Sequence, residues 1–174
     1  MRRIALIAAA LVLGAAALSF DRLGEPSAAQ PAWTETAWPF PMDQWGQGKA
    51  FICKAADCGT ELKVYIRAKI GFCSSTVGVS DDNELDRLSD FDFMNGATAG
   101  VGAGHIVNVA WMKGRLRTYA AAGKPRALSI AYNNDSDAVV ATVVAADAAV
   151  AEPAVIAFLG SERMQAWVKQ TLGL

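Results

Sequence analysis

Residues 48–73, with the sequence GKAFICKAADCGTELKVYIRAKIGFC, predict a β-hairpin and contain all three cysteines of the chain. Beyond the turn formers at 56–59, apolar side chains alternate with Lys63, Tyr65, Arg67 and Lys69, a period-2 pattern typical of a half-buried strand. One face of this strand is apolar and the other is basic. We interpret the basic face as solvated charge that protects a sheet from aggregation, with an anion-binding surface as the alternative.

The same hairpin favours a disulfide between Cys53 and Cys58. With a turn centred near Cys58, Cys53 lies opposite Leu62, whereas Cys73 follows about eleven residues further along the strand, more than ~30 Å away if it is straight. A disulfide needs Cα atoms within about 7 Å, so a bond to Cys73 requires the chain to bend back. The two pairings with Cys73, and no bond at all, remain open.

The amino terminus predicts an export signal. Arg2 and Arg3 precede an uncharged apolar run at 4–18, and Ala29 ends a small-residue segment suited to signal peptidase. We expect residues 1–29 to be a cleaved signal peptide, with cleavage after Ala17 as the competing site, and residues 30–174 to form one domain. An uncleaved anchor is the alternative, but fifteen apolar residues are fewer than the roughly 20 that span a bilayer. The expected location is therefore periplasmic or secreted, without membrane attachment after cleavage.

The charge of the chain restricts the classes of partner that it is expected to bind. The full chain has 16 basic and 17 acidic residues, and loss of three arginines and two acids with residues 1–29 leaves 13 against 15, a net charge of about −2. A nucleic-acid partner needs a dominant basic surface, so we expect none. The partner is predicted to be an envelope protein or a small molecule. In an oxidising compartment a disulfide is the default state of paired cysteines.

Residues 30–48 are rich in aromatic side chains and proline and predict an extended strap along the domain. Trp33, Trp38 and Trp45 could form a sugar-binding platform, but we interpret them as packing material for a small core. Residues 80–88, SDDNELDRL, then predict a helix, with Ser80 or Asp81 as its cap.

The middle of the chain predicts further strands. Residues 96–104 contain four glycines, but a β-rich run at 105–111 follows where a dinucleotide-binding loop would open a helix, so we predict a surface loop. A tight turn is expected at 112–115. Strands at 127–132 and 138–145 flank the turn formers at 133–137.

The carboxyl end changes to a helical period. Pro153 suits the first position of a helix that ends at Leu159, and Ser161 suits the cap of a second helix. We expect Gln165 on the exposed side of that helix. Its predicted core stripe is Met164, Trp167, Val168, Thr171 and Leu172. The fold class is therefore predicted to be α+β, an antiparallel β-meander sheet of five or six strands with one helix after the first hairpin and C-terminal helices packed on one face.

Candidate chemistry is sparse. His105 is the only histidine, and a thiol enzyme would need Cys73 as nucleophile beside it, although nothing predicts a lowered pKa for that thiol. Asp90 and Asp92 have the spacing of oxygen ligands for calcium but lack the closing bidentate acid. We expect neither catalytic nor metal residues and no cofactor, and retain Cys73, His105, Asp90 and Asp92 as a candidate functional surface.

Three segments, AADCGTELKVYIRAKIGFC, DDNELDRLSDFD and FLGSERMQAWVKQTLG, resemble an uncharacterised family of small exported bacterial proteins. The order of elements is also similar to the PsbP-like fold, an antiparallel sheet with helices packed on it. The resemblance implies export and carries over no functional residue. The prediction is an exported, non-catalytic accessory or binding module; the alternatives are a small hydrolase or thiol enzyme using Cys73 and His105, or a metal- or redox-sensing envelope protein.

Overall fold

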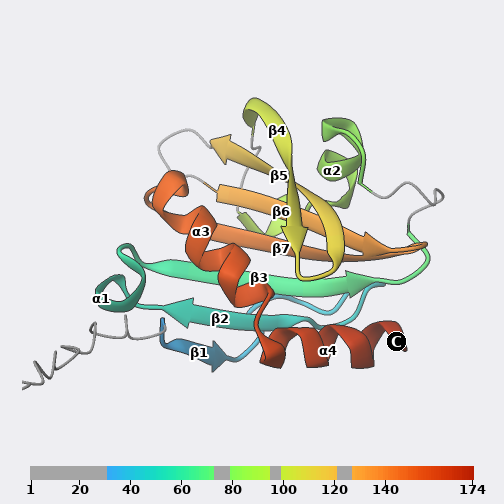
Figure 1. The fold of residues 1–174 in the computed structure, drawn as a ribbon, viewed down its shortest axis with the longest axis horizontal. Helices are drawn as coiled ribbons and strands as arrows, with labels where there is room; N and C mark the ends of the chain where they lie inside the picture. The colour runs from blue at the N-terminus through green and yellow to red at the C-terminus, as the bar shows by residue number, and fades with distance from the viewer. Residues whose placement is uncertain (1–30, 73–78, 95–98, 121–126) are drawn as a thin grey trace, which may run out of the picture.

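A computed structural model describes residues 31–72, 79–94, 99–120 and 127–174. It has one seven-stranded sheet, entirely antiparallel, in the order β1-β2-β3-β7-β6-β5-β4 (Figure 1). The strands are β1 (Trp33–Thr36), β2 (Lys49–Cys53), β3 (Leu62–Lys69), β4 (Ala99–Val109), β5 (Met112–Ala120), β6 (Ala127–Asn134) and β7 (Asp137–Ala145). The helices are α1 (Ala55–Cys58), α2 (Asp82–Leu88), the 3-10 turn η1 (Phe91–Met94), α3 (Ala148–Leu159) and α4 (Glu162–Leu172).

This architecture confirms the predicted α+β class, but the sheet has seven strands instead of five or six, because residues 33–36 of the predicted strap pair with β2 as the edge strand β1. After β3 the chain passes to the far edge of the sheet, and β4 to β7 then return strand by strand until β7 pairs with β3. The central strands β3, β6 and β7 are buried along most of their length. Strands so enclosed need cover on both faces of the sheet, and the molecule accordingly has three layers.

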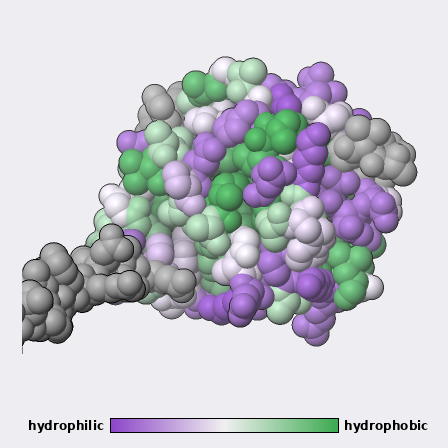
Figure 2. All heavy atoms as spheres, in the orientation of Figure 1, coloured by the Kyte–Doolittle hydropathy of each residue, from purple (hydrophilic) through white to green (hydrophobic). Residues whose placement is uncertain are grey.

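The first face carries the larger core under α3 and α4. Side chains of every strand from β2 to β7 meet the helices there, including Phe51, Leu62, Leu116 and Val143. Figure 2 views this side and shows hydrophobic side chains around its middle, with hydrophilic ones along its right side and lower rim. In Figure 1, α3 crosses the sheet and α4 runs beside the edge formed by β1 and β2.

Helix α3 starts earlier than the sequence indicated. Its N-cap is Asp147, whose carboxylate accepts hydrogen bonds from the amides of Ala149 and Val150, so Pro153 lies inside the helix instead of at its first position. Proline costs a helix interior more than a cap alone contributes, so the helix also depends on the packing of its buried face, which includes Ala151 and Val155, against the core.

Helix α4 has the predicted cap but a different buried side. Ser161 Oγ accepts from the Met164 amide at 3.5 Å, and Met164 and Val168 are buried. Trp167 and Leu172 pack only partly against the core and Thr171 is exposed. Gln165, expected in solvent, is buried because its Nε2 donates to the Leu159 carbonyl at 2.7 Å.

The second face is covered by residues 37–48, α2 and η1. Trp38 and Phe40 pack edge-on against Tyr65 and contact Phe93 of η1, which confirms the strap and shows its rings packing against the sheet. The predicted α2 cap is present, with Asp81 accepting from the Glu84 amide at 2.8 Å. The apolar side chains beneath α2 form a smaller core of Val79, Leu85, Leu88, Ala131, Ala138 and Val140.

This cover corrects our interpretation of the basic face. Arg67 and Lys69 are only 4% exposed and lie under the second layer, and of the three basic residues Lys63 alone stays partly exposed, beside Glu61. A period-2 pattern shows that a strand has two kinds of face, but a charged face can also be buried if acids from another element meet it.

The glycine-rich segment is also corrected, from a loop to part of β4. Gly104 lies so close to β5 that an added Cβ would stand 2.8 Å from the Leu116 carbonyl oxygen, and Gly102 has a φ of +71° at an irregularity in the β4–β5 register. The tight turn comes at Ala110 and Trp111, because Val109 pairs with Met112. The predicted turn at 112–115 is instead the start of β5.

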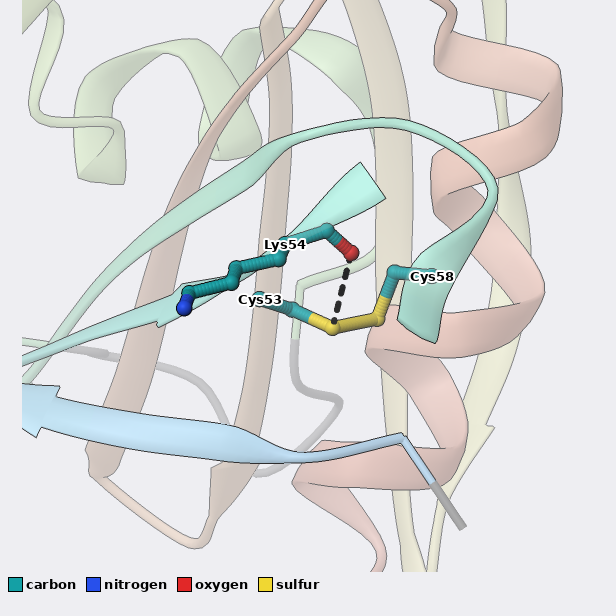
Figure 3. Close-up of a disulfide and its surroundings, with 3 residues drawn as sticks. All are labelled: Cys53, Lys54 and Cys58. Atoms are coloured by element: carbon teal, nitrogen blue, oxygen red, sulfur yellow. Dashed lines mark hydrogen bonds between the residues drawn. A yellow bond between two sulfur atoms is a disulfide. The ribbon is translucent and has the colours of Figure 1, made fainter. Parts of the chain in front are cut away.

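The hairpin of the opening segment forms in the predicted register, with Cys53 opposite Leu62. A disulfide joins Cys53 to Cys58, with Cα atoms 6.1 Å apart (Figure 3). The connection is the single-turn α1, ended by Gly59 at a φ of 73°. Figure 3 also marks Cys53 Sγ 3.8 Å from the Lys54 carbonyl oxygen; a disulfide sulfur has no hydrogen to donate, so this is a van der Waals contact.

Among the described residues, no helix is both long and apolar enough to cross a membrane. The predicted signal peptide lies outside the described residues.

Candidate functional site

Asp90, one of the predicted site residues, is a buried ion-pair partner. Its two oxygens accept from Arg67 at 2.9 and 2.6 Å, and Lys69 Nζ lies 2.8 Å from Oδ1. Asp43 accepts from the same guanidinium at 2.7 and 2.8 Å. Lys69 also donates to the Leu88 carbonyl at 2.6 Å. Every charged group of the cluster therefore has a partner, and its effect is to join the strap and the second layer to β3.

His105 lies on the other side of the sheet. It pairs with Leu116, which belongs to the core under α3 and α4, and its exposed Nε2 is 2.9 Å from Glu152 Oε1 of α3. Asp92 is exposed on η1, whose flanking Phe91 and Phe93 pack against Tyr119 and Trp38 on the second face.

The predicted surface is thus not one site. His105 and the two aspartates are separated by the sheet, and Cys73 lies outside the described residues. In the part of the chain that the structure describes, no group of three or more histidine, cysteine or acidic side chains could hold a metal ion.

A different feature stands out where β1 and β2 face α4. Two hollows meet at Arg163, and we refer to them together as the α4 groove. The first has a volume of about 700 Å³ and the second about 290 Å³. The first is lined by Pro31, Trp33, Ala154, Ala157, Phe158, Gly160, Ser161, Glu162 and Arg163. The second is lined by Lys49, Phe51, Arg163, Met164, Ala166, Trp167 and Gln170.

Aromatic rings form much of the groove wall. Trp33 stacks on Phe158 with ring centroids 4.2 Å apart, and Phe51 packs edge-on against the same phenyl ring at 4.9 Å. Trp33 and Trp167 are each only partly buried, so each indole leaves surface open to a ligand. Flat rings held by packing offer a stacking surface that loses little conformational entropy on binding.

An ion-pair cluster lies where the two hollows meet. Glu35 of β1 accepts from Lys49 Nζ at 2.6 Å through Oε1 and from Arg163 Nη2 at 2.5 Å through Oε2. The Arg163 guanidinium also lies 5.3 Å from the centroid of the Phe51 ring. The hydrogen bond from Lys49, opposed by partial desolvation and assisted by the hydrogen bond from Arg163, holds the pKa of Glu35 below its ordinary value.

Chemically, the α4 groove can bind but offers no proton-transfer or nucleophilic pair. The polar side chains that line it are two cations, the carboxylate of Glu162, a serine that caps α4 and a glutamine, and the two cations pair with the neighbouring Glu35. Beside these polar groups its wall is formed by aromatic rings and small apolar side chains. This combination is typical of a site that recognises an apolar body with a few polar anchors.

Sequence reasoning noted Trp33 and Trp167 but did not bring them together. The sequence pattern indicates packing for both, and it distinguishes neither Arg163 nor Glu35 from other surface charges. The available signal was the aromatic content of the strap combined with a helix that presents a tryptophan and an arginine four residues apart, Arg163 and Trp167.

Compared with protein-family models, curated proteins and solved structures, the chain has no match in any of the three.

Proposed function

We propose that this protein is an exported, non-catalytic binding module and that the α4 groove is its ligand site. The observation that carries the proposal is the groove itself, an open hollow with two partly exposed indoles, Trp33 and Trp167, along its wall. Site-forming hollows are typically apolar and aromatic with a few convergent polar groups.

Two further observations support the export part of the proposal. Residues 1–29 have the composition of a signal peptide, and the Cys53–Cys58 bond is of the kind that persists in the periplasm or outside the cell. The hydrolase alternative gains no support from the described residues, because the recorded partner of His105 is the surface carboxylate of Glu152.

Binding of the neutral probe N-phenyl-1-naphthylamine, followed by its fluorescence, tests the site. We expect wild-type protein to bind this probe. Ala157→Trp, which adds a ring at an exposed alanine lining the first hollow, should weaken binding by ~10-fold or more because the indole fills the space. The matched control is Ala149→Trp, at an exposed position of the same helix that is not among the groove residues, and it should bind as wild type does.

Both variants should unfold at the temperature of the wild type to within a few degrees, since both positions are exposed. Equal affinities of the two variants, or no binding of the probe by the wild-type protein, would contradict the α4 groove as the site.

A further inference from the structure

We propose that the ligand of the α4 groove carries an anionic group, and that this group takes the place of Glu35 between Lys49 and Arg163. The inference rests on the proposed function, because it names the chemical class of ligand for the same site: an apolar, ring-bearing molecule with a carboxylate or an equivalent anion.

The charges of the second hollow carry the inference. Lys49 and Arg163 both line it, and none of its lining residues is acidic. The partly exposed ring of Trp167 supplies apolar surface beside the two cations, and the buried Phe51 and Met164 complete the wall from the core. A hollow with two cations and an apolar wall is complementary to a molecule with one anionic end.

Glu35 satisfies both cations in the absence of a ligand. One oxygen accepts from Lys49 and the other from Arg163, so a single carboxylate occupies the place that a ligand anion would take. Glu35 lies on β1, outside the second hollow's lining, and its partners come from β2 and α4. The carboxylate is therefore an internal competitor for the same donors.

Because the three side chains of this ion-pair cluster are partly exposed, replacing Glu35 by a ligand anion costs little free energy. The side chains of Lys49, Glu35 and Arg163 are 31%, 38% and 55% exposed. Ion pairs with this much solvent contribute little net stability, so a ligand anion can displace Glu35 and let that carboxylate turn to water. The same exchange is unfavourable at the buried Arg67–Asp90 pair, where each side chain is 5% exposed.

The negative charge of Glu162 decides which of the two hollows takes the anionic group of the ligand. It lines the first hollow and is exposed at the start of α4, so an anion in the first hollow would meet a like charge. The anionic end of the ligand therefore lies in the second hollow, and the first hollow takes an apolar part.

A pair of fluorescent probes tests this inference. 1-Anilinonaphthalene-8-sulfonate and N-phenyl-1-naphthylamine have the same ring system, but only the first carries a negative charge. Glu35→Gln removes the competing charge while keeping the shape, and should tighten binding of the sulfonate by about 3- to 10-fold and leave binding of the neutral probe within about twofold. Arg163→Gln should weaken binding of the sulfonate by a similar factor, again with little effect on the neutral probe.

Lys54→Gln, which removes an exposed lysine outside the groove, is the control for nonspecific attraction of the anion and should change neither affinity. If Glu35→Gln and Arg163→Gln alter both probes equally or neither, the anion inference is wrong, and the groove still stands provided that Ala157→Trp blocks the neutral probe. If Ala157→Trp blocks neither probe, both the inference and the proposed function are wrong.

Discussion

Ala110 has a φ of 53°, a left-handed conformation that costs alanine roughly 1–2 kcal/mol. It is the first residue of the two-residue turn between β4 and β5. Glycine adopts such angles without a Cβ penalty, although it loses more entropy on folding. We predict that Ala110→Gly raises the free energy of unfolding by about 0.5–1 kcal/mol, measured by urea denaturation. The control is Ala103→Gly, an exposed β4 position outside the positive-φ residues, which should lower it; a destabilised Ala110→Gly would contradict the turn geometry.

Individual residues also show how far sequence reasoning reached. The caps at Asp81 and Ser161 were predictable because an N-cap is decided within three or four residues. The burial of Arg67 and the role of Asp90 were not, because they depend on a second layer that meets β3 only in the fold. A charged side chain on a strand is exposed to solvent only if no other element of the fold supplies a partner that covers it.

At the scale of elements, Asp82 anchors α2 to the β4–β5 edge. It accepts from the Gly104 amide at 3.1 Å and from Arg115 Nε at 2.6 Å, and these two bonds, in that order, lower its pKa against a smaller effect of desolvation. A carboxyl group with a lowered folded-state pKa stabilises the protein above its unfolded pKa of about 4, and this stabilisation is lost as pH falls through the lower folded-state value.

We therefore predict that Asp82→Asn lowers stability at pH 7 and reduces the loss of stability between about pH 5 and pH 2. Urea midpoints measured across that range provide the comparison. Asp92→Asn, at an exposed position of η1, should keep the wild-type profile. An Asp82→Asn profile parallel to that of the wild type would refute this role.

Contacts around the glycines of β4 show why this strand has the composition of a loop. Arg115 donates to the Gly104 carbonyl and Arg117 to the Gly102 carbonyl, and an added Cβ on Gly104 would stand 2.6 Å from Asp82 Oδ1. Glycine here makes room for side chains of the neighbouring strand and of α2. Glycine-rich composition usually predicts a loop, and nothing local in the sequence distinguishes this use.

For the whole molecule, the disulfide between Cys53 and Cys58 closes the β2–β3 hairpin, whose apolar side chains belong to the larger core. The bond spans five residues, and loop-closure entropy predicts that reduction lowers the free energy of unfolding by ~2 kcal/mol. Tryptic digestion without reductant should leave the peptides on either side of Lys54 joined, since Cys53 and Cys58 lie on opposite sides of that cleavage point. A bridge that contains Cys73 would contradict the structure.

The class of the fold and the hairpin register followed from the sequence because periodicity and turn chemistry are local. The α4 groove did not, because Glu35 and Arg163 are 128 residues apart and meet only once α4 lies beside β1. Its two indoles, Trp33 and Trp167, are far apart in the sequence, and each taken alone has the pattern of a packing residue.

The measurement that tests the α4 groove most directly is an NMR titration of the five tryptophan indole N–H signals with 1-anilinonaphthalene-8-sulfonate. Trp33 and Trp167 line the groove, whereas Trp38 and Trp45 pack on the second face and Trp111 lies at the β4–β5 turn. We predict saturable shifts of the Trp33 and Trp167 signals, with the other three signals nearly unchanged. Shifts confined to Trp38, Trp45 or Trp111, or no saturable shift, would contradict it.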